Sequence, residues 1–129
     1  MAEDGHADVR VLIVDDQAPF RRAARAVVTL TPGFEVVGEA ESGEDAVALA
    51  ASLRPGLVLM DINLPGINGI EATRRITTAA PATVVMLLST YQADDLPFDR
   101  EGSGAVAYVH KERFGPDVIR EVWADNSSI

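Results

Sequence analysis

The stretch Val58–Gly69, VLMDINLPGING, decides the fold of this chain. An apolar run ends there on a single acid, Asp61, and the chain then breaks on Pro65, Gly66 and Gly69. A buried strand that only had to stop could do so on Ser or Asn at a smaller desolvation cost. Asp61 is therefore either a cap or turn residue, or a group kept for its chemistry.

The composition indicates one acidic domain with a single core. The chain has 129 residues, and 20 acids against 11 bases give a formal net charge of -9. This charge argues against unaided binding to nucleic acid or to an anionic membrane, and it suits a basic protein partner or a bound cation. The chain has no cysteine, which excludes disulfides and Cys-based zinc sites. Because no apolar run approaches a membrane span and the N-terminus is acidic, we expect a cytoplasmic protein.

Short apolar runs alternate with amphipathic segments along the chain. Strands apolar on both faces, joined by amphipathic helices, predict a doubly wound, five-stranded parallel α/β sheet in a three-layer sandwich. We expect one domain over residues 9–124, a disordered tail over 1–8 and a frayed tail over 125–129. The strands are expected at Val9–Val14, Phe34–Ala40, Leu57–Met60, Thr83–Leu88 and Ala105–Val109, and the helices at 18–30, 42–53, after Asn68 and at 116–123.

Three of the helices carry specific predictions. In the first helix, the arginines including Arg21 are expected to face water, opposite the apolar stripe. Ser42 is expected to cap the second helix, with Asp45 completing a pattern like a capping box. A fourth helix would be short or partly unwound, because Pro97 stands where that helix should be under way.

Polar residues gather where the expected strands end. In a doubly wound sheet, ligands bind at the carboxyl ends of the strands. Taken singly, Asp16 could cap a helix, Asp61 could be a turn residue, Ser89 a loop hydroxyl and Lys111 a solvated charge. Together at one edge they form a cluster of three acids with a lysine, and such close carboxylates require a cation. The residues at this edge are Asp15, Asp16, Asp61, Ser89, Thr90 and Lys111.

The cation expected at this edge is Mg²⁺, which prefers oxygen ligands and commonly uses one or two carboxylates. Neither histidine is placed to ligate it. His6 lies in the N-terminal tail, and His110 should point away from its neighbour Lys111 because side chains alternate along a strand. Both histidines are therefore interpreted as inert.

Four segments, VDDQ, MDINLPGINGIEATRRI, LLST and AYVHK, resemble the receiver domain of bacterial two-component response regulators. The resemblance implies the CheY-like, flavodoxin-like (βα)5 fold and covers the chain from about Val9 to Trp123. The run EVVGEAESGEDAV is most similar to the NarL/FixJ branch.

The resemblance implies a role for each residue at this edge. Asp61 matches the phosphoacceptor, which takes a phosphoryl group from a sensor histidine kinase. Asp15 and Asp16, with Asp61 and the Asn63 carbonyl, match the Mg²⁺ ligands. Further matches are Lys111 as the partner of the phosphoryl group, Ser89 as the switch hydroxyl and Tyr108 as the switch aromatic.

The sequence also departs from the family pattern. Thr90 replaces a residue that is usually small, so it could narrow access to the phosphoryl site. Asn63 and Tyr91 occupy the positions that tune phosphoryl lifetime in the family. The fourth helix, around Pro97, lies on the face that receivers normally use for output.

The function implied is a phosphorylation-controlled binding switch, not an enzyme beyond its own phosphorylation and dephosphorylation. Phosphorylation would alter the surface of the fourth helix, fifth strand and fifth helix, and so control an output domain or partner, with transcriptional regulation as the expected outcome. A C-terminal DNA-binding output domain outside this chain and a homodimer are both compatible with the resemblance.

Three rival functions are alternatives to this interpretation. A degenerate receiver that binds constitutively remains open, because Thr90 and the fourth helix are atypical. A phosphatase of the haloacid-dehalogenase type would need a second aspartate two residues after the first, where Asn63 stands. A dinucleotide-binding enzyme would need a Gly-rich loop after the first strand, and VDDQAPF has none.

Overall fold

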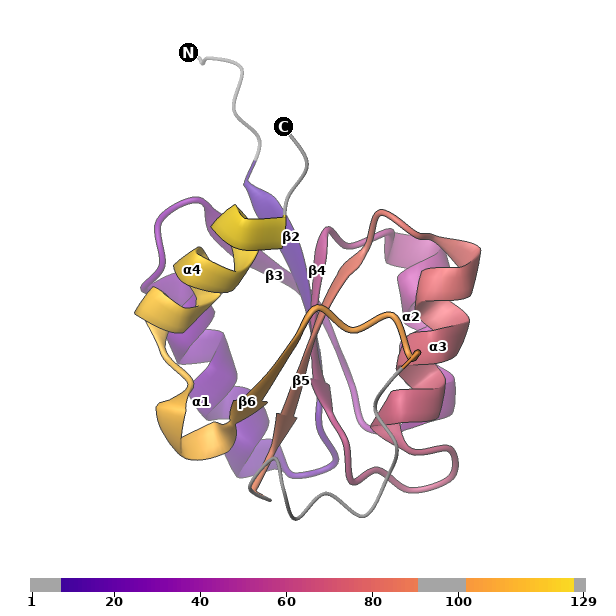
Figure 1. The fold of residues 1–129 in the computed structure, drawn as a ribbon. Coiled ribbons are helices and arrows are strands. Elements are labelled where there is room, and N and C mark those ends of the chain that lie inside the picture. The colour runs from indigo at the N-terminus through magenta and orange to yellow at the C-terminus, as the bar shows by residue number, and fades with distance from the viewer. Residues whose placement is uncertain (1–7, 91–101, 127–129) are drawn as a thin grey trace.

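A computed structural model describes residues 8–90 and 102–126 of the chain. Its strands form one five-stranded sheet in the order β3-β2-β4-β5-β6, and every pairing is parallel, which confirms the predicted sheet (Figure 1). The predictions for the tail over 1–7, for Tyr91 and for the helix around Pro97 lie outside the described residues. The elements are β2 (Val9–Val14), α1 (Ala18–Thr29), β3 (Phe34–Ala40), α2 (Gly43–Leu53), β4 (Leu57–Asp61), α3 (Gly69–Ala79), β5 (Val84–Ser89), β6 (Ala107–His110), the 3₁₀ turn η2 (Lys111–Arg113) and α4 (Pro116–Asn126).

The helices cover the sheet in two layers. Helices α1 and α4 lie on one face, and α2 and α3 lie on the other (Figure 1). Alternate residues of β2 pack on opposite faces of the sheet. Leu12 packs toward α2 and α3, whereas Ile13 packs toward α1 and α4. Burying one such side chain contributes about 1.5–3 kcal/mol. The apolar runs of the central strands are therefore explained by a core on both sides.

Side chains cap the starts of two helices, and the cap at Ser42 confirms a prediction. The Ser42 Oγ accepts a hydrogen bond from the Asp45 N–H at 3.1 Å, and Asn68 Oδ1 accepts one from the Glu71 N–H at 2.9 Å. Helix α1 has Gln17, not Asp16, at its N-cap and no side-chain cap. The capping interpretation of Asp16 is therefore wrong.

Several element ends differ from the prediction. Asp61 is the last residue of β4 and Ser89 is the last residue of β5, so both belong to the sheet ladder and do not merely follow it. Strand β6 begins two residues later than expected and continues to His110. Helix α4 continues to Asn126, three residues beyond the expected end at Trp123.

Trp123 of α4 packs at the end of the sheet opposite to Asp61. Its ring lies edge-on to Phe34, with the ring centroids 6.2 Å apart and an interplanar angle of 85°. It also lies against Gly56, where a Cβ would stand 3.3 Å from the indole. Phe34 and Gly56 lie at or just before the beginnings of β3 and β4, so the tryptophan is remote from the carboxyl ends of the strands.

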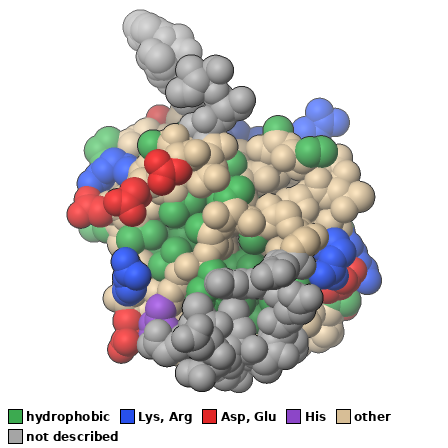
Figure 2. Space-filling view, in the orientation of Figure 1, with side chains coloured by type: hydrophobic (Ala, Val, Ile, Leu, Met, Phe, Trp, Pro, Cys, Tyr) green, Lys and Arg blue, Asp and Glu red, His purple; other side chains and the backbone are tan. Residues whose placement is uncertain are grey.

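One face of the molecule is notably apolar. Figure 2 shows hydrophobic side chains gathered over the region of β6 and α4, with charged side chains toward the margins. Val106, just before β6, is 39% exposed.

Candidate functional site

The carboxyl edge of the sheet brings three aspartates together. Asp15 follows β2, Asp16 is its neighbour, and Asp61 ends β4. One carboxylate oxygen from each lies within 4.8 Å of the others. Asp15 and Asp61 are buried and Asp16 is exposed, so the cluster opens to solvent on one side. The predicted convergence of these acids is confirmed in geometry.

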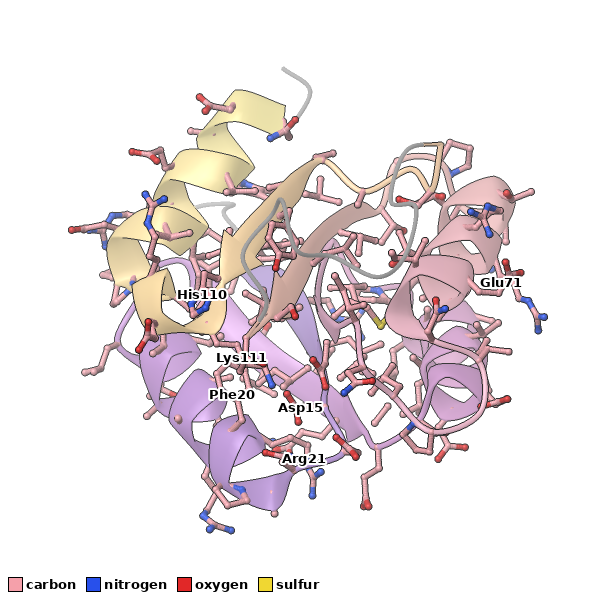
Figure 3. All side chains as sticks on the ribbon, turned by 60° about the horizontal axis from the view of Figure 1, so that its bottom comes forward. Asp15, Phe20, Arg21, Glu71, His110 and Lys111 are labelled. Atoms are coloured by element: carbon pink, nitrogen blue, oxygen red, sulfur yellow. The ribbon has the colours of Figure 1, made fainter. Side chains whose placement is uncertain are left out.

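Lys111 enters the same cluster from the first residue after β6. Its Nζ lies 2.6 Å from Asp15 Oδ2 and 3.5 Å from Asp61 Oδ1, and its side chain is only 14% exposed. The ammonium also lies 4.3 Å from the centroid of the Phe20 ring, a cation–π contact (Figure 3). Lys111 is therefore held by two acids and an aromatic face, and the interpretation as a solvated charge is wrong.

Phe20 belongs to this site although the sequence marked it only as a residue of the apolar face of α1. Its ring contacts Phe114 at a centroid distance of 6.1 Å as well as the Lys111 ammonium. An aromatic residue one helical turn after the acid pair was the available signal. Its spacing cannot distinguish a core residue from one that lies under a cation.

The environment of Asp61 favours its protonated form. Burial, and then the negative charge of Asp15, raise the pKa of its carboxyl from about 3.8 to about 6. The Lys111 ammonium and the backbone N–H of Asn63 act in the opposite direction and lower it. The carboxylate would thus be stabilised by further positive charge.

The donor set fits Mg²⁺. Three carboxylates can each offer one oxygen from within a sphere of ion-binding size, and no nitrogen or sulfur donor joins them in the described cluster. Hard oxygen donors with one side open to water are what Mg²⁺ binds, since it keeps several waters. The raised pKa of Asp61 points in the same direction, because a divalent cation would offset the repulsion from Asp15.

The loop after Asp61 is shaped by a close backbone approach at Gly69. The Gly69 N–H donates to the Ile62 carbonyl at 2.8 Å, and a Cβ at position 69 would collide with the Asp61 carbonyl. Glu44 of α2 holds the same loop, because its Oε2 accepts from the Ile67 N–H at 3.1 Å. The glycine that breaks the sequence after Asp61 is therefore required where α3 starts against the end of β4.

Arg21 is not the water-facing residue that helical periodicity predicted. Its side chain is only 14% exposed. It donates a hydrogen bond from Nη1 to the Asp15 carbonyl at 2.7 Å and another from Nε to Glu39 Oε1 at 3.1 Å. Glu39 also pairs with the more exposed Arg25. The prediction failed because a long side chain can reach back over the strand end from the polar side of its helix. Arg21 thereby fixes the loop that carries the acid pair.

The other predicted site residues differ in burial and position. Ser89 is buried at the end of β5, next to the exposed Thr90. Tyr108 is half-buried in β6 and packs against the core under α2 and α3. Asn63 is exposed in the loop after Asp61. Tyr91 lies outside the described residues.

Comparisons with known proteins agree with this architecture. A model of the response regulator receiver domain matches residues 11–123. The chain is 35% identical over 114 residues to the transcriptional regulatory protein DegU of Brevibacillus brevis, covering 88% of this chain and 48% of DegU. It is 41% identical over 111 residues to protein-glutamate methylesterase/protein-glutamine glutaminase 4 of Myxococcus xanthus, covering 84% of this chain and 31% of that protein.

Among solved structures, the signal receiver domain of NarL from Mycobacterium tuberculosis superposes with a TM-score of 0.83 at 25% identity, covering 93% of this chain and 97% of that one. The chain spans about half the length of DegU. No helix in the described ranges is long and apolar enough to cross a membrane. With the family model matching almost the whole chain, and with the acid cluster and lysine at the expected edge of the sheet, the chain belongs to the response regulator receiver domain family.

Proposed function

We propose that Asp61 accepts a phosphoryl group and that this modification switches the binding surface of the domain. The observation that carries the proposal is the placement of Asp61. Its carboxylate is buried at the end of β4, lies 3.5 Å from the Lys111 ammonium and shares the acid cluster with Asp15 and Asp16. A nucleophilic carboxylate needs positive charge nearby to accept a phosphoryl group.

In the reaction, an oxygen of the Asp61 carboxylate attacks the phosphorus of a phosphohistidine on a sensor histidine kinase. The O–P bond forms as the P–N bond breaks, and the histidine nitrogen leaves. Mg²⁺, held by Asp15, Asp16, Asp61 and the Asn63 carbonyl, supplies charge that neutralises the phosphoryl oxygens when it is bound. Lys111 contributes a second positive charge, because its ammonium lies 2.6 Å from Asp15 Oδ2.

Hydroxyl and aromatic residues then convert the modification into a change of surface. Ser89, at the end of β5, donates to a phosphoryl oxygen, and Tyr108 of β6 changes its packing in response. Thr90 and the residues at 63 and 91 limit access of water to the phosphoryl group, which sets its lifetime. The surface that changes is that of β6, α4 and the segment over 91–101, part of which lies outside the described residues.

The partners follow from the same role. The donor is a sensor histidine kinase in the cytoplasm, and the receiver controls either an attached output domain or a second protein. The transcriptional regulatory protein DegU supports a transcriptional output, whereas the methylesterase relative supports an enzymatic one. The receiver itself acts as a signalling domain and makes no direct contact with nucleic acid. A homodimer through the switched surface is part of this proposal.

The test is the intact mass of the protein after incubation with Mg²⁺ and acetyl phosphate. The wild type and the Asp125→Asn control, which alters an exposed acid of α4, should both gain one phosphoryl group. Asp61→Asn should gain none. Loss of the adduct in hydroxylamine would identify an acyl phosphate. An adduct that persists in Asp61→Asn would show that another residue is the acceptor. No adduct in the wild type would favour the constitutively binding receiver.

A further inference from the structure

His110 makes two hydrogen bonds, and one of them links the ends of neighbouring strands. It is the last residue of β6 and pairs with Ser89 in the sheet register. Its Nε2 lies 2.8 Å from the Thr90 carbonyl oxygen, and its Nδ1 lies 3.2 Å from the Glu112 backbone nitrogen. The ring is only 14% exposed and, in Figure 3, lies beside Lys111 without joining the acid cluster.

The two partners fix which nitrogen carries the proton. A carbonyl oxygen only accepts, so Nε2 must donate to Thr90, and a backbone N–H only donates, so Nδ1 must accept from Glu112. Both contacts are satisfied together by a single neutral tautomer of the imidazole. His110 thus has a hydrogen-bond partner at each ring nitrogen, and it is not a member of the acid cluster.

The bridge connects two groups of the proposed phosphoryl site. Ser89 directly precedes Thr90, and Lys111 directly follows His110. The ladder between β5 and β6 ends at the pair Ser89 and His110, so nothing in that ladder restrains the Thr90 backbone. The imidazole adds a restraint one residue beyond the last pair. The residues that carry the hydroxyl (Ser89) and the ammonium (Lys111) are thus joined through the hydrogen bond between His110 and Thr90.

We propose that His110 is a positioning residue that holds the Ser89–Thr90 segment and Lys111 at a fixed separation, so that both reach the same phosphoryl group. This role rests on the proposed function of Asp61. The ring nitrogens of His110 bond Thr90 and Glu112, whereas the acid cluster comes from the loop after β2 (Asp15 and Asp16) and the end of β4 (Asp61). Without the bridge, Asp15 still holds the Lys111 ammonium at 2.6 Å, so the Ser89–Thr90 segment is the part that shifts. Loss of the bridge should therefore weaken phosphoryl recognition and leave Mg²⁺ binding intact.

Three substitutions separate the two hydrogen bonds of the ring. His110→Ala removes both. His110→Asn keeps an acceptor near the position of Nδ1 for the Glu112 N–H but is too short to reach Thr90. His110→Gln can place an amide N–H near the position of Nε2 and restore the bond to the Thr90 carbonyl. The readouts are the affinity for Mg²⁺ alone and the affinity for beryllofluoride, a phosphoryl mimic, at saturating Mg²⁺.

We expect His110→Ala and His110→Asn to bind beryllofluoride about three- to tenfold more weakly, the range that one neutral hydrogen bond supports. His110→Gln should remain within about twofold of the wild type, and all variants should keep the wild-type affinity for Mg²⁺ within the same margin. Unchanged beryllofluoride affinity in His110→Ala would overturn the proposal. So would a parallel loss of Mg²⁺ affinity, or rescue by Asn in place of Gln, which would assign the effect to the turn at Glu112.

A second measurement separates this proposal from the proposed function. Amide hydrogen exchange of the free protein should be faster around Thr90 and Lys111 in His110→Ala than in the wild type, with no change in β2. A wild type that takes neither acetyl phosphate nor beryllofluoride would refute the phosphoryl role of Asp61. In that case faster exchange would still establish the link, and unchanged exchange would refute it as well.

Discussion

The Lys111 ammonium lies closer to Asp15 than to Asp61, at 2.6 Å from Asp15 Oδ2 against 3.5 Å from Asp61 Oδ1. The lysine is thus held first by an acid proposed to bind the cation, and only second by the proposed nucleophile. Lys111 and a divalent cation therefore compete for the same negative charge. The charge of the cluster, and not only its shape, decides how tightly Mg²⁺ binds.

Replacement of Lys111 by methionine should make this competition visible. Because the ammonium lowers the pKa of Asp61, Lys111→Met should raise that pKa above about 6. Removing a positive charge beside the acids should also strengthen Mg²⁺ binding at pH 8, where Asp61 is ionised, by about three- to tenfold. Carbon-13 NMR titration of the Asp61 carboxyl and calorimetric Mg²⁺ titration measure the two effects. Arg113→Met, which alters an exposed base of η2, is the control. Weaker Mg²⁺ binding would contradict the argument.

Asp61 should destabilise the Mg²⁺-free protein at neutral pH. Its pKa is about 6 in the folded protein and near 3.8 when unperturbed, so between these values the folded state binds more protons than the unfolded chain. Stability is therefore lost as pH rises from about 4 to 6, and the penalty is complete above that range. At pH 7 in EDTA, Asp61→Asn should be more stable than the wild type, on the order of 2 kcal/mol.

Urea unfolding followed by circular dichroism at pH 4 and pH 7 tests this sign. The advantage of Asp61→Asn should shrink toward zero at pH 4. An advantage of equal size at both pH values would mean that the substitution acts through packing and not through the charge of Asp61.

Mg²⁺ should stabilise the folded wild type, because the acid cluster is assembled only in the folded chain. A free concentration 100 times the dissociation constant corresponds to about 2.7 kcal/mol. Asp16→Asn, which removes the exposed acid of the cluster, should reduce the shift in melting temperature at the same Mg²⁺ concentration. Asp125→Asn should not. Equal shifts in all three proteins would place the cation elsewhere.

Gly69→Ala should be strongly destabilising because the new Cβ would collide with the Asp61 carbonyl. Neither atom can withdraw easily, since β4 and α3 are fixed by their own hydrogen bonds, so a loss of about 3 kcal/mol or more is expected. Gly115→Ala is the matched control, because nothing lies within 4 Å of the position of its Cβ. Chemical denaturation of both variants measures the difference, and a similar small cost in each would refute the close approach.

Arg21 should matter more than its neighbour Arg22 although both are arginines of α1. Arg21→Met leaves the Asp15 carbonyl without the guanidinium that binds it and should cost about 1–3 kcal/mol in stability. It should also weaken Mg²⁺ binding by disordering the loop that carries Asp15 and Asp16. Arg22→Met, at an exposed position, should change neither quantity. Equivalent behaviour of the two variants would show that the contact of Arg21 is dispensable.

The sheet was predictable from sequence because its strands are apolar on both faces and its helices are amphipathic. The convergence of Asp15, Asp61 and Lys111 followed from one topological fact, that parallel strands present their carboxyl ends at the same edge. Local signals were equally informative where they involved neighbouring residues, as at the Ser42 cap. Ladder ends and the continuation of α4 to Asn126 were less accessible, because fraying and pairing at element ends depend on tertiary contacts.

The contacts that sequence reasoning missed all join residues far apart in the chain. Helical periodicity places Arg21 on the polar face but says nothing of its reach to Glu39. Strand alternation predicts that His110 points away from Lys111 but does not reveal that its ring bonds the Thr90 carbonyl. Phe20 under the Lys111 ammonium is a third example. Each depends on the separation of two backbone segments, which composition and spacing do not encode.

The position of Trp123 determines what the intrinsic fluorescence of this protein can report. It is the single tryptophan of the chain, and it packs on Phe34 and Gly56 at the amino ends of the strands. Its emission should therefore respond to global unfolding and be nearly silent to events at Asp61, at the other end of the sheet. A tryptophan introduced in place of Phe20, against the Lys111 ammonium, would supply the optical signal at the site that the native chain lacks.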